Sequence, residues 1–294
     1  MNDLWHANTP EARLFRENAR SFNNAVCLTS IKVNMRHFKK GFNPSIIFEG
    51  KATQLAGPLK AADGEQPCFA QLYVHDPVLE SSLRFKNMVI PANMSHAQKR
   101  VIENILTKIQ KLLHNLNPFV QDFKQVIEIP IEEFGHGKIV ISAKARPTGE
   151  HKRRYNTQIN LQEVSILTNS MPHDLVLQPR GGSLQKISDL NPKGMPLHFT
   201  LLFPYGTYGW DPDRKHADGK RRVTTREFYV YHLNQRDIDR DYIHLAGRLF
   251  QEWICMAWVA VENQKLNYQR MNQKALRADS LRALKRQPRT REDS

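Results

Sequence analysis

The chain has 294 residues, of which 43 are lysine or arginine and 29 are aspartate or glutamate, so its formal net charge is +14. This excess favours a polyanionic partner, above all nucleic acid, because binding releases the counterions that a polyanion condenses. Three scattered cysteines (Cys27, Cys68 and Cys255) exclude a disulfide framework and a zinc knuckle, and no apolar run approaches the roughly 20 residues of a membrane helix. The cysteines fit a reducing compartment, either the cytosol or the nucleus, and with a nucleic-acid partner we expect the nucleus.

The N-terminal part carries both helix and strand signals. Thr9 is a suitable cap, and Pro10 a suitable first-turn residue, for a helix that runs to about Phe22. Residues 45–48 give a short strand signal. Residues 69–74 alternate in polarity and stop at a turn signal, which predicts a second strand.

Two helices are predicted in the middle of the chain. Ser95 caps the first, over residues 97–115, where apolar residues recur at spacings of three and four. The second covers residues 118–128 and opens at an Asn-Pro pair. Residues 138–145 and 156–168 have the pattern of further strands.

The last third begins with a strongly apolar stretch, residues 198–203, which predicts a strand. A polar, basic loop follows over residues 211–222. Either Thr224 or Thr225 can cap the next helix. A long final helix is predicted over residues 242–284.

The order of these elements favours an α+β fold over a regular parallel α/β sheet. We expect mixed short strands with helices in the N-terminal part, and a helical segment that ends in one long C-terminal helix. The predicted organisation is an α+β domain (residues 1–170), a loop-rich connector with an apolar strand (171–222) and a helical segment (223–294).

The sequence contains no motif for catalysis. It has no His-x-His pair, the spacing that places two imidazoles on one strand face to hold a divalent ion. It has no G-x-x-x-x-G-K-[ST] loop either, so ATP binding has no support. Tyr229 and Tyr231 lack a neighbouring metal pair and are interpreted as packing groups rather than nucleophiles. We predict no catalytic residue, no metal site and no cofactor.

Positive charge gathers in three clusters that could meet phosphates. They are Lys144, Arg146, Lys152, Arg153 and Arg154; Arg214, Lys215, Lys220, Arg221, Arg222 and Arg226; and Arg270, Lys274 and Arg277. From these we predict DNA contacts by Lys152, Arg153, Arg154, Arg221, Arg222, Arg226, Arg270, Lys274 and Arg277. The alternative for each cluster is a solvated surface, and the third, which falls on one helix face, could instead dock on an acidic surface of another domain.

The second cluster has the clearest mechanism. Its basic loop leads into a predicted helix N-terminus, whose partial positive charge and free N–H groups suit a phosphate. Tyr205 and Tyr208 precede the loop and could stack on the bases of a single strand. Phe203 and Trp210 are predicted to be core residues.

Six stretches together form a recognisable series. They are residues 15–23 (FRENARSFN), 69–76 (FAQLYVHD), 117–123 (NPFVQDF), 201–210 (LLFPYGTYGW), 228–236 (FYVYHLNQR) and 247–251 (GRLFQ), with Glu262, Leu266, Gln273 and Arg277 in step behind them. In this order they resemble the blocks upstream of the nuclease domain in Helitron-type rolling-circle transposases. The resemblance covers nearly the whole chain. One departure is Cys255-Met256, which stands where the family often has an apolar residue and Asp.

The resemblance implies a protein that moves DNA by a rolling-circle route. In the family, a nuclease with a His-hydrophobic-His metal site and an ATP-dependent helicase lie downstream of the matched region, so no catalytic residue is carried over. We expect the chain to be an N-terminal, pre-catalytic fragment that binds DNA but does not cut or unwind it. Its expected partners are single-stranded or duplex DNA and the nuclease and helicase domains, with no membrane and no small-molecule ligand.

Two other functions remain open. One is a protein-interaction or scaffold module of a transposon-derived protein without DNA contact. Its basic clusters would be scattered over the fold rather than gathered on one face. The other is a nicking enzyme with an unrecognised site, which incubation with single-stranded DNA and Mg²⁺ or Mn²⁺ would reveal.

Overall fold

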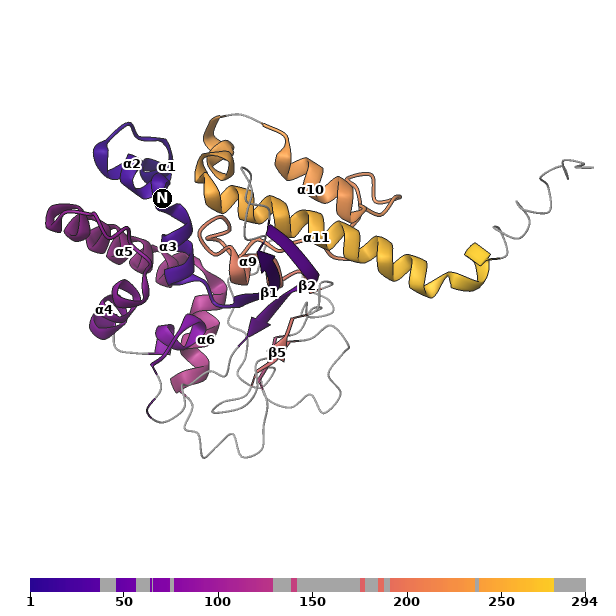
Figure 1. Ribbon diagram of the computed structural model, residues 1–294, viewed down its shortest axis with the longest axis horizontal. Helices are drawn as coiled ribbons and strands as arrows, with labels where there is room; N and C mark the ends of the chain where they lie inside the picture. Colours follow the sequence, from indigo (N-terminus) through magenta and orange to yellow (C-terminus); the bar gives the residue numbers. More distant parts are fainter. Residues whose placement is uncertain are drawn as a thin grey trace, which may run out of the picture.

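The fold is α+β, as expected, with helices in the majority and a small antiparallel sheet (Figure 1). The computed structural model describes residues 1–37, 46–56, 64, 66–74, 77–128, 139–141, 175–177, 185–187, 191–235 and 238–277.

Three short helices form the N-terminal end: α1 (Asn2–His6), α2 (Pro10–Glu17) and α3 (Ala19–Val26). The Thr9 side chain accepts a hydrogen bond from the Ala12 amide at 3.2 Å, which is the predicted cap. The single helix predicted to reach Phe22 is wrong, because the chain leaves helical geometry at Asn18. The Asn18 side-chain amide donates to the Leu14 carbonyl at 2.9 Å, a local bond that competes with helix continuation.

The next helices are α4 (Pro77–Asn87), α5 (His96–Leu116) and α6 (Pro118–Glu128). Ser95 and Gln98 form a reciprocal capping box at the start of α5, so the predicted cap is confirmed. The predicted α6 is also confirmed. The sequence predicts these two helices because the capping residue and the periodic apolar residues indicate the same helix in each case.

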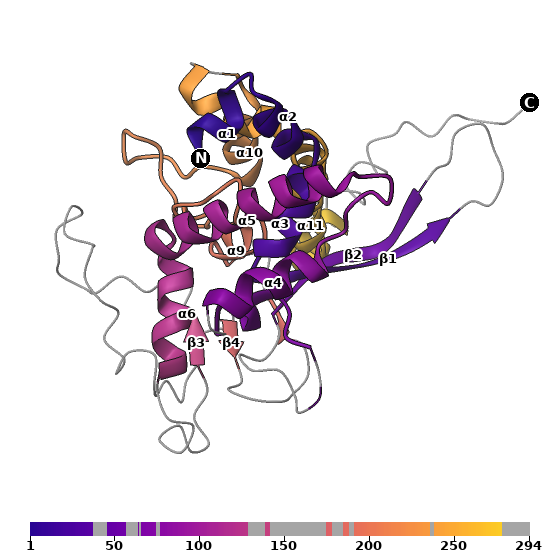
Figure 2. The same ribbon diagram turned by 90° about the vertical axis from the view of Figure 1, so that its left-hand side faces the viewer.

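The sheet is built on β1 (Ser30–His37) and β2 (Ile46–Ala56), which pair antiparallel, and on the short β5 (Gln185–Lys186). The β1–β2 ribbon reaches out from the helices (Figure 2). A second pair joins β3 (Ile139–Ile141) to β4 (Leu175–Leu177). The strand signals at 45–48 and 138–145 thus fall on β2 and β3, whereas the predicted strand 156–168 lies outside the described residues.

The predicted strand over residues 69–74 is wrong, because this segment is the 3₁₀ helix η1 (Phe69–Val74). The four consecutive residues 70–73 are all buried, which a strand with one buried face does not allow. The Tyr73 hydroxyl donates to the Val26 carbonyl at 2.5 Å and joins η1 to the end of α3. Packing on α3 has therefore overridden the alternating pattern.

The predicted apolar strand over 198–203 is also wrong. The segment is the end of α9 (Gly194–His198) followed by tight turns, in which the Phe203 amide donates to the Phe199 carbonyl at 2.9 Å. All of residues 191–204 are buried, so the segment is apolar because it crosses the centre of the molecule.

The C-terminal part consists of α10 (Thr225–Leu233), the 3₁₀ helix η2 (Ile238–Ala246) and α11 (Arg248–Met271). The predicted start of the last helix at residue 242 is wrong, since Gly247, with φ +53°, separates η2 from α11. A helical turn continues beyond Met271 to residue 277, and the end of α11 projects from the body (Figure 1).

One hydrophobic cluster runs from Trp5 to Trp253 and includes residues of all three predicted segments. Trp253 of α11 is 1% exposed, and the Phe250 and Tyr229 rings lie against it. Among the described residues, no helix is long and apolar enough to span a membrane.

Candidate nucleic-acid interface

The basic loop predicted before α10 forms a short hairpin, residues 214–223, which we call the basic hairpin. Lys215 and Arg222 form an antiparallel bridge, and the Val223 amide donates to the Arg214 carbonyl at 2.8 Å. The turn lies at Gly219, whose φ of +70° suits a residue without a side chain. The cationic side chains therefore stand on an ordered backbone.

Two contacts anchor the basic hairpin to the core. The Trp210 ring N–H donates to the Val223 carbonyl at 2.8 Å. Arg214 donates to the Gly209 carbonyl at 3.1 Å, and its guanidinium lies 5.1 Å from the centre of the Phe228 ring. Arg214 is thus an anchoring residue, whereas the other cations of the cluster are exposed.

The exposed cations of this region differ in how far they are neutralised. Arg221 pairs with Glu227 at 2.8 Å, and Arg222 lies 3.7 Å from Asp213. Lys215, Lys220 and Arg226 form no ion pair with any acidic residue that the structure describes. These three are the cations best able to meet a phosphate, and the first two were not among the predicted contact residues.

The N-terminus of α10 is already occupied by a carboxylate. Thr224 caps the helix, and Glu227 reaches back to the Thr224 amide at 2.9 Å. Hydrogen bonds from the Thr224 backbone and side chain hold the pKa of the Glu227 carboxyl below its ordinary value. A phosphate at this helix end would meet a negative charge, which argues against the position predicted for it.

Tyr205 and Tyr208 lie on the segment that leads to the basic hairpin and are 65% and 37% exposed. The Lys193 ammonium lies 5.5 Å from the centre of the Tyr208 ring, and the Phe119 ring packs at 6.1 Å. Phe203 is buried, as predicted, while Trp210 is only partly buried. Both tyrosine rings are therefore accessible to a base, and that of Tyr208 also lies beside a cationic group.

The third basic cluster lies where α11 leaves the body. Arg270, Lys274 and Arg277 are all exposed. The helix α11 ends at Met271, because Asn272 leaves helical geometry (φ −103°, ψ 20°), and a further helical turn covers residues 273–277. Arg270 therefore lies on α11 and Lys274 and Arg277 on the next helical turn, so the prediction of one continuous helix face for all three is wrong.

The second and third clusters lie at the same end of the α10–α11 pair. The Thr225 hydroxyl, at the start of α10, donates to the Gln264 side chain, and Tyr229, one turn later, packs on Trp253 at 5.8 Å. The two helices therefore run antiparallel. Arg270 follows Gln264 by about 9 Å along α11. The predicted contacts Lys152, Arg153 and Arg154, with Lys144 and Arg146, lie outside the described residues.

Three findings concern the groups that could take part in catalysis. The described residues contain no group of three His, Cys, Asp or Glu side chains that could hold a metal ion. Tyr229 packs against the Phe228 and Trp253 rings. Burial raises the pKa of the Cys27 thiol to about 12, so this sulfur stays protonated at neutral pH.

Comparison with known proteins finds no matching family model and no matching curated sequence.

Proposed function

We propose that the chain binds DNA without cutting it, through the basic hairpin and the projecting end of α11. In this proposal it is the N-terminal DNA-binding region of a Helitron-type transposase and works in the nucleus beside the nuclease and helicase domains. One observation carries the proposal: two basic clusters far apart in sequence are brought to one end of the α10–α11 pair. Scattered clusters would have favoured the scaffold function.

The binding mode follows from which groups are accessible. Lys215, Lys220 and Arg226 would contact phosphates and release counterions, while Tyr205 and Tyr208 would stack on unpaired bases. Stacking requires bases that are free of a partner strand, so a single strand is the favoured form of DNA. The negative charge of Glu227 directs the phosphates to the hairpin surface rather than to the end of α10.

The test is the salt dependence of binding to a labelled oligothymidylate of about 15 nucleotides, near the upper end of single-strand site sizes. Affinity should fall steeply between about 50 and 200 mM salt. Replacing Lys215, Lys220 and Arg226 together by alanine should lower the log–log slope by as much as about two units.

A matched control variant removes the same number of positive charges from another part of the molecule. Lys99, Arg100 and Lys111 lie on α5, away from the α10–α11 pair (Figure 1). Their replacement by alanine should leave the slope nearly unchanged. A flat salt response of the unmodified protein, or equal effects of the two triple variants, would contradict the proposal.

A second candidate function, a protein-interaction module, is favoured by apolar side chains on the outer part of α11. Trp258, Leu266 and Met271 are 67%, 57% and 86% exposed. Such surface is typical of sites that bind other proteins. This candidate predicts no salt-dependent binding of the oligonucleotide, so the same titration separates the two functions.

A further inference from the structure

A cleft of about 540 Å³ opens between α3, η1 and α11, outside the proposed DNA-contacting surface. Arg20, His198 and Glu252 provide charged and polar groups on its wall, and Pro67, Phe69 and Leu72 provide apolar surface. Glu252 precedes Gln264, where α10 begins to cover α11, by about 18 Å of helix. The cleft is large enough for a nucleoside, since small-ligand pockets measure roughly 300–1,000 Å³.

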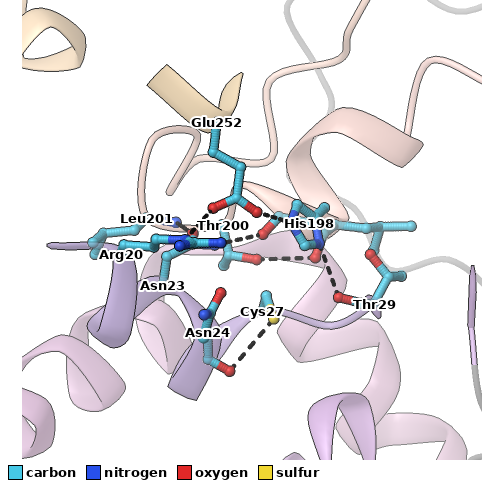
Figure 3. A network of polar contacts seen from close by, with 10 residues as sticks. Arg20, Asn23, Asn24, Cys27, Thr29, His198, Thr200, Leu201 and Glu252 are labelled. Atoms are coloured by element: carbon cyan, nitrogen blue, oxygen red, sulfur yellow. Dashed lines mark hydrogen bonds and ion pairs between the residues drawn. The ribbon is translucent and has the colours of Figure 1, made fainter. Parts of the chain in front are cut away.

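Arg20 and Glu252 are paired but keep unused hydrogen-bonding capacity. The Arg20 Nε–H donates to Glu252 Oε2 at 2.7 Å (Figure 3). The Arg20 side chain is 55% exposed, and its terminal amino groups bond to no described residue. A guanidinium has five N–H donors, so the paired Arg20 retains donors for a ligand.

The other oxygen of Glu252 has a buried neighbour. Glu252 Oε1 lies 3.7 Å from His198 Nε2, which is longer than a hydrogen bond. The other ring nitrogen, Nδ1, lies 3.0 Å from the Thr29 carbonyl and must carry a hydrogen to bond to it. His198 is 4% exposed, and its Nε2 has no hydrogen-bond partner in the part of the chain described.

The position of these groups is set by the core. The Asn23 side chain of α3 donates to the His198 carbonyl at 2.9 Å and accepts from the Leu201 amide at 3.1 Å (Figure 3). It thereby fixes α3 against the end of α9, and α11 brings Glu252 across both. Burial alone would raise the pKa of Glu252, but His198 and the charge of Arg20 hold it below its ordinary value. The carboxylate is therefore ionised at neutral pH.

The paired side chains present a donor beside two acceptors, which is the hydrogen-bonding edge that cytosine offers in a base pair. We propose that the cleft binds a guanine base, with guanine O6 accepting from the Arg20 guanidinium and the N1–H and N2 amino groups donating to Glu252. Adenine is rejected, because its amino group would face the guanidinium and its N1 lone pair would face the carboxylate. A contact of this kind reads a base whose pairing edge is free.

The backbone conformation of Phe69, on the apolar wall of the cleft, supports the assignment of the cleft as a binding site. Phe69 is the one described residue other than glycine with a positive φ, +52°, and it lines the cleft. Backbone strain of this kind is concentrated at binding sites.

The base could come from a free guanine nucleotide or from a DNA strand held by the basic hairpin. For the second source the inference rests on the proposed function. Guanosine is a probe that carries no phosphate, so its binding does not depend on the basic hairpin.

The first experiment is calorimetric titration of the full chain with guanosine, inosine and adenosine. Guanosine should bind, inosine should bind at least about tenfold more weakly because it lacks the N2 donor to a charged acceptor, and adenosine should not bind measurably. No folding artefact enters this comparison, because the protein is unchanged. Absence of guanosine binding, or equal binding of adenosine, would overturn the proposal.

Variants locate the site. Glu252→Gln keeps the size of the side chain but replaces one acceptor by a donor, so guanosine binding should fall at least about tenfold. Arg13→Gln, an exposed arginine on α2, is the control and should bind normally. A Glu252→Gln protein that melts like the parent and still binds guanosine would place the site elsewhere and overturn the assignment.

A second arm uses oligothymidylate with and without one central guanine. Tighter binding of the guanine-containing strand, lost in Glu252→Gln, identifies the strand as the source. Guanosine binding without such a preference identifies the free nucleotide. Salt-dependent oligothymidylate binding without guanosine binding would overturn this inference alone, and the reverse result would overturn the DNA-binding proposal alone.

Discussion

At the scale of single residues, the molecule contains an ionic cluster whose complete burial no sequence pattern indicates. Arg84 and Glu80 are fully buried one helical turn apart on α4, with Arg84 Nε donating to Glu80 Oε1 at 2.9 Å. Arg84 also donates to the Ala25 carbonyl and stacks 3.9 Å above the Tyr73 ring. His114 of α5 lies 3.0 Å from the other Glu80 oxygen. One guanidinium thus joins three helices.

Removing that guanidinium should be costly. Arg84→Met should lower the free energy of unfolding by about 3–5 kcal/mol, because it leaves the Glu80 carboxylate buried without its main partner. The double variant Arg84→Met/Glu80→Leu should recover part of the loss, since no unpaired charge remains. Urea denaturation followed by circular dichroism measures both. A double variant less stable than Arg84→Met would show that the loss of stability does not come from the unpaired Glu80 carboxylate.

Asp122 of α6 gives a pH-dependent prediction. Burial raises its pKa to about 6, and the nearby Lys193 opposes the rise only in part. The unfolded carboxyl ionises first as pH increases, so stability falls between about pH 4 and 6. Asp122→Asn should therefore match the parent below pH 4 and exceed it by about 1–2 kcal/mol above pH 6, after allowance for partial exposure. Denaturation at several pH values checks this; a constant difference would refute it.

At the scale of elements, substitutions at two glycines distinguish the cost of backbone strain from the cost of a steric clash. Gly206 (φ +64°) and Gly219 (φ +70°) both have positive φ, but a Cβ at Gly206 would lie 2.9 Å from Pro118 Cγ, while nothing lies within 4 Å at Gly219. Gly219→Ala should cost about 1–2 kcal/mol from backbone strain alone. Gly206→Ala should cost more, because the Pro118 ring must also move. Thermal unfolding of the two variants measures the difference, and equal losses would mean that the ring yields freely.

Elements were predictable where local signals agreed with packing. The Ser95–Gln98 capping box and the periodic apolar residues of α5 act within one helix, so both can be read from the sequence. The alternation at 69–74 and the apolar run at 198–203 could not be read in this way. Residues 70–73 and 198–203 are buried whichever way their side chains point, so their apolar character does not mark a strand face.

At the scale of the whole molecule, the end of α11 has no described neighbour to hold it. Its residues 265–271 are all exposed, whereas α5 is buried along one face. Backbone amides after Gln264 should therefore exchange with deuterium much faster than those in the middle of α5. Mass spectrometry of exchanged peptides measures this. Equal protection would indicate that a second chain covers the projecting helix.

The residues of the candidate site, too, could be predicted only in part from the sequence. The sequence shows a cluster of cations that includes Lys215, Lys220 and Arg226. Only the structure distinguishes these three from Arg221 and Arg222, which face carboxylates. The Arg20–Glu252 pair joins residues 232 positions apart. No sequence signal marks either residue.

The sequence by itself determined the charge, the α+β class, the caps of α2 and α5 and the existence of a long C-terminal helix. These depend on composition or on residues a few positions apart, for which the physical interaction is local. Only the tertiary structure decided the antiparallel pairing of α10 with α11, the shared position of the two basic clusters and the cleft beside Glu252. Each of these depends on contacts between distant segments, whose geometry is set when the common core packs.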